Sequence, residues 1–197
     1  MKIDEKYALS ILKNELKHLK DALKNSQDPY HYFYLSTINK NVPQSRTVVL
    51  RSINKNPLKL YFNTDKRSNK VNEIKKNPAC NVLFYDNLRR IQLRLNCNAI
   101  LHHKNKLTKN VWNNTVLQSR KCYMAPYPPS SKLEKWEANL PKKYFECDPS
   151  LEDNKKGYEN FCTVELEVIS FEIIELKYNG HIRFQINKNN NVDFLAS

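Results

Sequence analysis

The chain has 197 residues, of which 40% are apolar and 11% aromatic, and its formal net charge is +13. This composition can bury a hydrophobic core and excludes an intrinsically disordered protein. Apolar runs stay well short of the roughly 20 residues of a membrane-spanning helix, and the N-terminus lacks the basic-then-apolar order of a signal peptide. We therefore expect one domain over residues 1–197, located in the cytoplasm, with no membrane partner.

Glycine and cysteine usage narrows the class of site. The whole chain has two glycines, Gly157 and Gly180, whereas dinucleotide fingerprints and P-loops need several at fixed spacing. Rossmann dehydrogenases and P-loop NTPases are thereby excluded, and any phosphate must be held by side chains and ordinary backbone. The five cysteines include no C-x-x-C pair, so we expect reduced structural thiols and no metal site.

The positions of the arginines are more informative about a binding site than the net charge is. Lysine and asparagine occur throughout the chain, which indicates a solvated surface more than a nucleic-acid-binding stripe. Arginine is scarce, and all of it except Arg120 and Arg183 lies within residues 45–94. We therefore expect no nucleic-acid partner, although a basic nucleic-acid-binding barrel is an alternative.

The predicted elements begin with an amphipathic helix over about residues 4–25, which we expect to dock on the domain as part of an N-terminal segment 1–28. Helices are also expected at 69–76, 104–119 and near Trp136, and residues 141–160 are expected to form a surface loop. Predicted strands span 32–38, 42–53, 58–63, 79–85, 89–101, 161–176, 181–186 and 192–195. This order indicates a mainly β fold with inserted helices, an antiparallel barrel that is closed or nearly so.

The strand 42–53 is the first candidate for a binding role. Alternation places Arg46 and Arg51 on opposite faces, at the two ends of an apolar run. Guanidinium groups form bidentate, charge-assisted bonds with phosphate, so the strand suits a planar ring system with a phosphate tail. From this strand alone, surface ion pairs are the stronger interpretation.

Residues 64–70 form the second candidate. Thr64, Arg67, Ser68 and Lys70 fall within seven positions, at the start of the predicted helix 69–76. A helix N-terminus favours anions through its free N–H groups and its dipole, so this turn predicts a phosphate site without glycine. A capped and solvated helix start is the alternative. Gln92 follows in a strand, where its amide suits either a heteroaromatic ring edge or solvent.

Four motifs, in this order, resemble those of the FMN-binding split-barrel family of pyridoxamine 5′-phosphate oxidase. They are S-R-T-V-V-L-R at 45–51, F-N-T-D-K-R-S-N-K-V at 62–71 followed by N-P, R-I-Q-L-R at 90–94, and H-I-R-F at 181–184. The resemblance runs from about residue 32 to the end and looks closest to a branch of flavin oxidoreductases. It implies a homodimeric split barrel that binds FMN between its two chains.

The resemblance also implies roles for individual residues. The phosphate is held by Arg46, Arg67, Ser68 and Lys70, while Asn63 and Thr64 occupy the positions of a Tyr-Thr pair. The backbone of 48–50 lines the isoalloxazine, and Gln92 and Arg183 come from the second subunit. The implied cofactor-binding residues are Arg46, Val48, Val49, Leu50, Arg51, Asn63, Thr64, Arg67, Ser68, Lys70, Gln92 and Arg183.

The residues that correspond to the family's substrate-binding positions depart from the family pattern. The family's R-x-H-x-R array reads Asn179-Gly180-His181-Ile182-Arg183 here, so its first arginine is missing, and Leu176 replaces a strand-end tryptophan. The resemblance implies an FMN-dependent oxidoreductase acting on a small molecule, with His181 and Arg51 as candidate catalytic residues and Arg120 and His181 as candidate substrate contacts. A non-catalytic flavin carrier or sensor on the same fold is the alternative, and a haem-handling split barrel is a further one.

Overall fold

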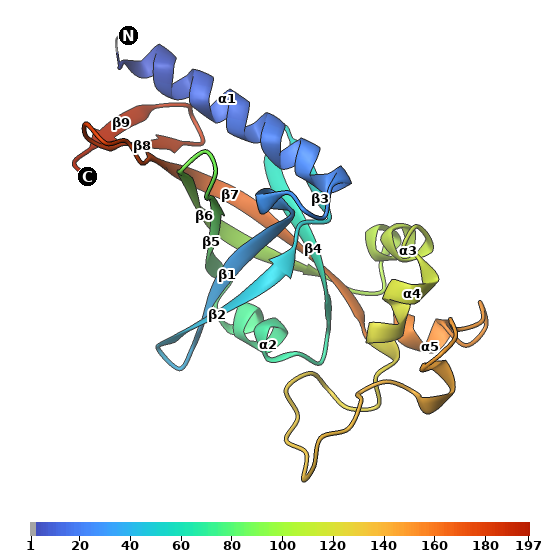
Figure 1. Ribbon diagram of the computed structural model, residues 1–197. Coiled ribbons are helices and arrows are strands. Elements are labelled where there is room, and N and C mark those ends of the chain that lie inside the picture. The colour runs from blue at the N-terminus through green and yellow to red at the C-terminus, as the bar shows by residue number, and fades with distance from the viewer. Residues whose placement is uncertain (1–2) are drawn as a thin grey trace. The chain divides into compact units, whose positions relative to one another are not determined.

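A computed structural model describes residues 3–197 of the chain (Figure 1). The chain folds into two compact units. Unit 1 comprises the chain up to Phe62 together with 77–100 and 165–197, and unit 2 comprises 63–76 and 101–164. The expectation of a single domain stays a prediction.

Unit 1 begins with the helix that the apolar spacing predicted. Helix α1 spans Glu5–Asp21 and continues as a 3-10 turn, η1, over Ala22–Lys24. Asp4 caps its start by accepting a 3.0 Å hydrogen bond from the backbone N–H of Tyr7, as N-cap aspartates do. The face carrying Ala8, Leu12 and Leu19 is buried, so the amphipathic pattern marks the side on which the helix packs.

The sheet is antiparallel in every pairing described strand by strand. Its strand order is β2-β1-β5-β6-β7-β4-β3, with β8 on β7 and β9 on β8. The strands are β1 Tyr32–Asn39, β2 Val42–Val49, β3 Ser52–Lys55, β4 Leu58–Asp65, β5 Ala79–Asp86, β6 Ile91–His102, β7 Phe161–Glu175, β8 Ile182–Asn187 and β9 Val192–Leu195. The predicted mainly β, antiparallel class is confirmed.

The core of unit 1 follows from the two-residue period of its strands. Alternate residues of β1, β5 and β6 are buried, among them Phe33, Phe84 and Leu93. The ring of Phe33 lies 5.3 Å from that of Phe84 and 5.9 Å from that of Phe62. Each such ring stabilises the fold by about 1.5–3 kcal/mol through burial, which explains why this part of the pattern was readable from the sequence.

The predicted strand 42–53 is wrong at two residues, because the chain changes partners there. β2 pairs with β1 as far as Val49, and the backbone N–H of Leu50 donates to the carbonyl of His31 at 2.9 Å. The N–H of Arg51 instead donates to the carbonyl of Tyr61, on β4, at 2.8 Å. Arg46 and Arg51 therefore lie on either side of a strand break.

Unit 2 carries most of the helices, and two helix predictions fail in it. Its helical segments are α2 Asn69–Lys76, α3 Lys106–Asn113, α4 Leu117–Arg120, η3 Lys121–Met124, η4 Lys142–Tyr144 and α5 Lys155–Tyr158, while η2, Pro29–His31, belongs to unit 1. The helix expected over 104–119 is interrupted at 114–116, where two asparagines precede the β-branched pair Thr115-Val116, all poor helix formers. The helix expected near Trp136 does not form, and the loop 141–160 contains two short helices.

Trp112 is the centre of the aromatic core of unit 2. Its ring lies 5.0 Å from that of Phe161 and 5.8 Å from those of Tyr123 and Tyr158. A Cβ added to Gly157 would come within 2.9 Å of the Trp112 ring, which is closer than a side chain tolerates. One of the two glycines of the chain is therefore required for packing rather than for a phosphate loop.

Candidate functional site

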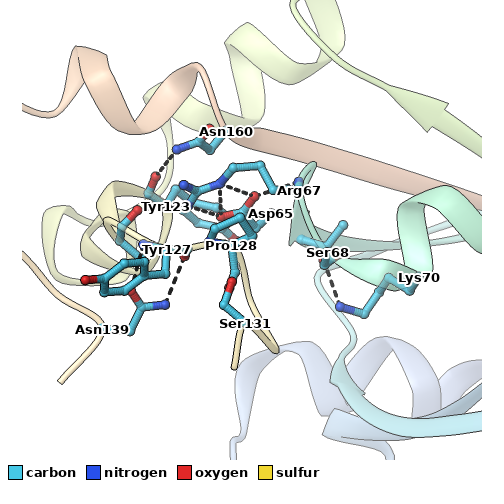
Figure 2. A network of polar contacts seen from close by, with 12 residues as sticks. Asp65, Arg67, Ser68, Lys70, Tyr123, Tyr127, Pro128, Ser131, Asn139 and Asn160 are labelled. Atoms are coloured by element: carbon cyan, nitrogen blue, oxygen red, sulfur yellow. Dashed lines mark hydrogen bonds and ion pairs between the residues drawn. The ribbon is translucent and has the colours of Figure 1, made fainter. Parts of the chain in front are cut away.

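The strongest candidate site is the turn between β4 and α2, residues 64–70, which we call the anion turn. The Nζ of Lys70 donates to the Oγ1 of Thr64 at 3.1 Å, and that oxygen lies 3.2 Å from the Oγ of Ser68. Thr64 and Ser68 are buried, and Figure 2 shows Ser68 and Lys70 on one side of the network. Three predicted phosphate ligands thus come together where α2 begins and its dipole favours an anion.

Arg67 is positioned differently from the other residues of the anion turn. Its Nη2 and Nε donate to Asp65 at 2.7 and 3.0 Å, and its backbone N–H donates to the same carboxylate at 2.8 Å. The Nη2 also donates to the carbonyl of Ala125 at 2.9 Å. Asn160 makes a second link, because its backbone carbonyl accepts the N–H of Lys66 at 2.7 Å and its Nδ2 donates to the carbonyl of Tyr123 at 2.9 Å. Arg67 thereby fastens the turn to residues 123–125, and its role toward phosphate stays a prediction.

The residues predicted on β2 lie in unit 1. Arg46 is half-buried, and its Nη1 donates to the hydroxyl of Thr37 and to the carbonyl of Leu35. Val48 and Val49 pair with Phe33 and Tyr32 of β1. Leu50 is buried and Arg51 is exposed just beyond the strand break. The predicted roles of these five residues stay predictions.

Gln92 and Arg183 also belong to unit 1. Gln92 is half-buried on β6 and pairs with Tyr85 of β5. Arg183 donates to the Oε1 of Glu172 from Nη2 at 2.7 Å and from Nε at 3.0 Å, while Arg94 donates to the other carboxylate oxygen. One buried glutamate therefore fixes the orientation of two arginines.

The remaining predicted residues have local partners. Asn63 accepts a hydrogen bond from the Oγ1 of Thr163 at 3.0 Å. Arg120 is buried over the ring of Trp112, and its guanidinium donates to the carbonyl of Thr115 at 2.7 Å, to that of Asn113 at 3.1 Å and to the Oδ1 of Asn154 at 3.2 Å.

These contacts favour a structural role for Arg120. Burial lowers the pKa of its guanidinium. His181 contrasts with it, because it is exposed and its Nδ1 accepts the N–H of Lys177 at 3.2 Å. A substrate role for either residue stays a prediction.

The residue types in the sequence did not predict the carboxylates that bind Arg67 and Arg183, which are Asp65 and Glu172. The sequence offered a signal for Asp65, because an aspartate in a turn readily accepts the backbone N–H of the residue two positions later. Here that residue is Arg67. Glu172 offered a second signal, because it lies in the largely apolar strand β7. A charged residue buried in such a strand requires a partner, and Glu172 is buried. Asn160 offered no such signal, because its link to Tyr123 depends on the tertiary fold.

The donors of the anion turn fit a phosphate ester. A phosphate monoester presents oxygens that accept several hydrogen bonds and carry negative charge. The turn offers the ammonium of Lys70, two hydroxyls and the first N–H groups of α2, all without glycine. Thr64, Ser68 and Lys70 are therefore the residues that would hold the phosphate of a bound cofactor.

The fold and the anion turn together define an antiparallel sheet protein with a candidate anion site at a strand-to-helix turn. Residues 13–103 match the family model described as pyridoxamine 5′-phosphate oxidase, FMN-binding domain. Over these residues the chain resembles this family of FMN-binding proteins, and FMN is the cofactor of the matched domain. The resemblance suggested by the four motifs is thus confirmed.

Individual relatives agree with this assignment. The chain is 29% identical over 161 residues to "pyridoxine/pyridoxamine 5′-phosphate oxidase 2" of Arabidopsis thaliana, covering 78% of this chain and 77% of that protein. A pyridoxamine 5′-phosphate oxidase-related, FMN binding protein of Nostoc punctiforme superposes with a TM-score of 0.69 at 20% identity, over 93% of this chain and 95% of its own. PhzG of Burkholderia lata superposes with a TM-score of 0.66 at 14% identity, over 96% and 92%. These two structures support the fold.

Two further observations bear on other classes of protein. Within residues 3–197, none of the helices combines the length and the apolar character that crossing a membrane requires. The same residues contain no cluster of three or more His, Cys, Asp or Glu side chains arranged to hold a metal ion.

Proposed function

We propose that the chain is an FMN-dependent oxidoreductase that acts as a homodimer on a small molecule. The observation that carries the proposal is the convergence of Thr64, Ser68 and Lys70 at the start of α2, within a chain that resembles an FMN-binding family. When bound, FMN supplies the two-electron chemistry, and the protein supplies binding, orientation and charge.

The anion turn would anchor the phosphate and so set where the ring lies. An ammonium together with two preoriented hydroxyls provides charge-assisted bonds whose geometry is already fixed in the protein. Arg46 is a further phosphate contact in this proposal, as the family resemblance implies. Gln92 of the partner subunit and Arg183 of the partner subunit would complete the site, the latter oriented by its glutamate.

Arg51 and His181 are the residues available for chemistry in this proposal. Both are exposed, so a small molecule can reach them. The guanidinium of Arg51 would stabilise negative charge that develops beside it, and the imidazole of His181 would act as a general acid or base. A loss of turnover in Arg51→Met or His181→Asn without a loss of FMN would support these assignments.

A second candidate function is a flavin carrier or sensor that does not turn over. It is favoured by the guanidinium of Arg120, which is buried and committed to Thr115, Asn113 and Asn154. Asn179, where the family pattern has an arginine, points the same way.

An absorption spectrum of the purified protein tests the proposal directly. We expect a yellow protein that releases FMN on denaturation and elutes at twice the mass of the 23.3 kDa chain. Reduced protein is then mixed with oxygen, and oxidised protein with pyridoxamine 5′-phosphate or NAD(P)H. Turnover with any donor supports the oxidoreductase, and tight FMN binding without turnover supports the carrier. A colourless protein that ignores added FMN contradicts both.

A further inference from the structure

Residues 126–145 of unit 2 contain an unusual set of exposed aromatic side chains. Trp136 is 89% exposed, Phe145 52% and Tyr127 41%. Large aromatic side chains are normally at least half-buried. A cluster of exposed ones is more typical of a binding surface than of the rest of a protein surface.

These three rings surround a hollow of about 520 Å³, which we call the aromatic hollow. Its lining also includes Pro126, Glu137 and Lys142. The volume lies within the roughly 300–1,000 Å³ that is usual for small-molecule pockets. The aromatic rings and the prolines offer apolar surface, while one lysine and one glutamate of the lining provide the charged groups.

The walls of the hollow are held in place by hydrogen bonds within the loop. The side chain of Asn139 accepts the N–H of Tyr127 at 3.0 Å and donates to its carbonyl at 3.0 Å. Asn139 thereby fastens one side of the loop to the other, next to Ala138, which lines the hollow. The N–H of Tyr144 donates to the carbonyl of Pro141 at 2.9 Å. A loop closed in this way loses less conformational entropy when a ligand binds.

The loop is also fastened to the anion turn. Arg67 donates to the carbonyl of Ala125, the residue that precedes the first lining residue. Figure 2 shows Arg67 and Asp65 between Tyr123 and Tyr127 on one side and Ser68 and Lys70 on the other. A ligand in the hollow and a phosphate on the turn would therefore be held by the same unit.

We propose that the aromatic hollow binds a planar aromatic monocarboxylic acid, with its rings on Tyr127, Trp136 and Phe145 and its carboxylate at Lys142. Glu137 lines the same hollow and disfavours a second negative charge, which makes a monoanion the fitting class. The inference deepens the proposed function, since the acid would be the small molecule on which the FMN protein acts. Nothing in the proposal needs Arg120.

Calorimetric titration of the FMN-saturated protein with 2-naphthoate tests the proposal. We expect binding to the wild type and weaker binding of cyclohexanecarboxylate, which lacks the flat rings. Phe145→Ala and Trp136→Ala should each weaken naphthoate binding about tenfold, as loss of an aromatic pair does. Lys142→Gln should weaken it about fivefold, the upper range for a partly exposed charge pair.

Matched controls come from the same unit. Leu151→Ala removes an exposed apolar side chain, and Lys135→Gln removes a lysine beside Trp136, but neither residue lines the hollow. Both variants should bind naphthoate as the wild type does. Naphthalene-2,6-dicarboxylate should bind more weakly than 2-naphthoate, and Glu137→Gln should reduce that difference.

Three results would overturn the inference. These are no binding of naphthoate, equal binding of cyclohexanecarboxylate, and unchanged binding in the Phe145, Trp136 and Lys142 variants. Iodide quenching of Trp136 that decreases as the protein concentration rises would also overturn it, because a second copy would then cover the hollow. Flavin content and reduction are measured on the same samples. Naphthoate binding to a protein that turns over none of the electron donors named above would leave the binding inference standing while the oxidoreductase proposal fails.

Discussion

A strand-end aspartate that binds an arginine just after it is found in both units, and the two pairs have different surroundings. Asp65 ends β4 in unit 2 and Asp86 ends β5 in unit 1. Asp65 accepts the backbone N–H of Arg67 at 2.8 Å and its Nη2 at 2.7 Å. Asp86 accepts the N–H of Arg89 at 3.0 Å and its Nε at 2.6 Å.

The groups around each Asp–Arg pair determine its role. Arg89 also donates to Glu15 at 2.7 Å, a side chain that is 2% exposed, and lies over the ring of Tyr30. That pair is closed by a buried carboxylate and an aromatic ring, so it serves the fold. Arg67 instead donates to the backbone carbonyl of Ala125, in the same turn in which Lys70 donates to the hydroxyl of Thr64. The same two residue types after a strand therefore serve the core in unit 1 and fasten a loop in unit 2.

The largest expected effect is on stability, in unit 1. Arg89→Met leaves Glu15 buried without its cation and should lower the free energy of unfolding by about 3 kcal/mol. Urea denaturation measures it, and FMN affinity of the folded fraction should stay within about twofold. Arg90→Met, which removes an exposed neighbouring arginine, is the control. Equal stability of the two variants would remove the structural role assigned to Arg89.

Lys70→Met should have the largest effect on cofactor binding. A hydrogen bond to a charged group contributes about 1.5–3 kcal/mol, so FMN affinity should fall about 10- to 100-fold. Quenching of flavin fluorescence measures the change. Lys76→Met removes a lysine from the far end of the same helix and should leave affinity nearly unchanged, because the phosphate is expected at its beginning.

Arg67→Gln sharpens the comparison further. If Arg67 mainly fastens the loop, FMN affinity should fall less than in Lys70→Met, by about fivefold at most, which corresponds to the roughly 1 kcal/mol of a neutral hydrogen bond. Limited proteolysis should at the same time cut residues 126–145 faster. A loss of affinity equal to that of Lys70→Met, with unchanged proteolysis, would instead make Arg67 a phosphate ligand, as the motif resemblance implied.

The smallest expected effect is the pH dependence of the Asp86 pair. Burial raises the pKa of the Asp86 carboxyl, but hydrogen bonds from Arg89 and Leu88 outweigh it and lower the pKa below the ordinary 3.8. A depressed carboxyl pKa contributes stability above the unfolded value, which is lost as pH falls through the folded value. The stability difference between wild type and Asp86→Asn should therefore be full at pH 6 and shrink below about pH 3.8. A constant difference would contradict this account.

Most of the fold could be predicted because it follows from local patterns. The periods of α1 and of the β strands were visible in the placement of apolar residues such as Leu12, Phe33 and Leu93. The failures came where tertiary contacts override local preference. The break at Leu50 depends on which strand receives each N–H, and the segment near Trp136 is organised by Asn139 rather than by a helix.

The candidate site could be predicted as far as the residue types indicate which side chains bind an anion. Thr64, Ser68 and Lys70 come together because a strand end and a helix start fix their spacing. Arg67 and Arg183 were recognised as cations, but their orientation depends on Asp65 and Glu172. A motif identifies the side chains, whereas the direction in which each one points depends on the carboxylate or carbonyl that the folded chain places beside it.

If the anion turn holds the phosphate of FMN, it should distinguish FMN from riboflavin. Riboflavin has the same ring system without the phosphate, so the ratio of the two dissociation constants isolates the phosphate contacts. The wild type should bind FMN at least about tenfold more tightly. Lys70→Met should reduce this ratio, while Lys76→Met should preserve it. Equal affinity of the wild type for both flavins, or a ratio unchanged in Lys70→Met, would contradict this role of the anion turn.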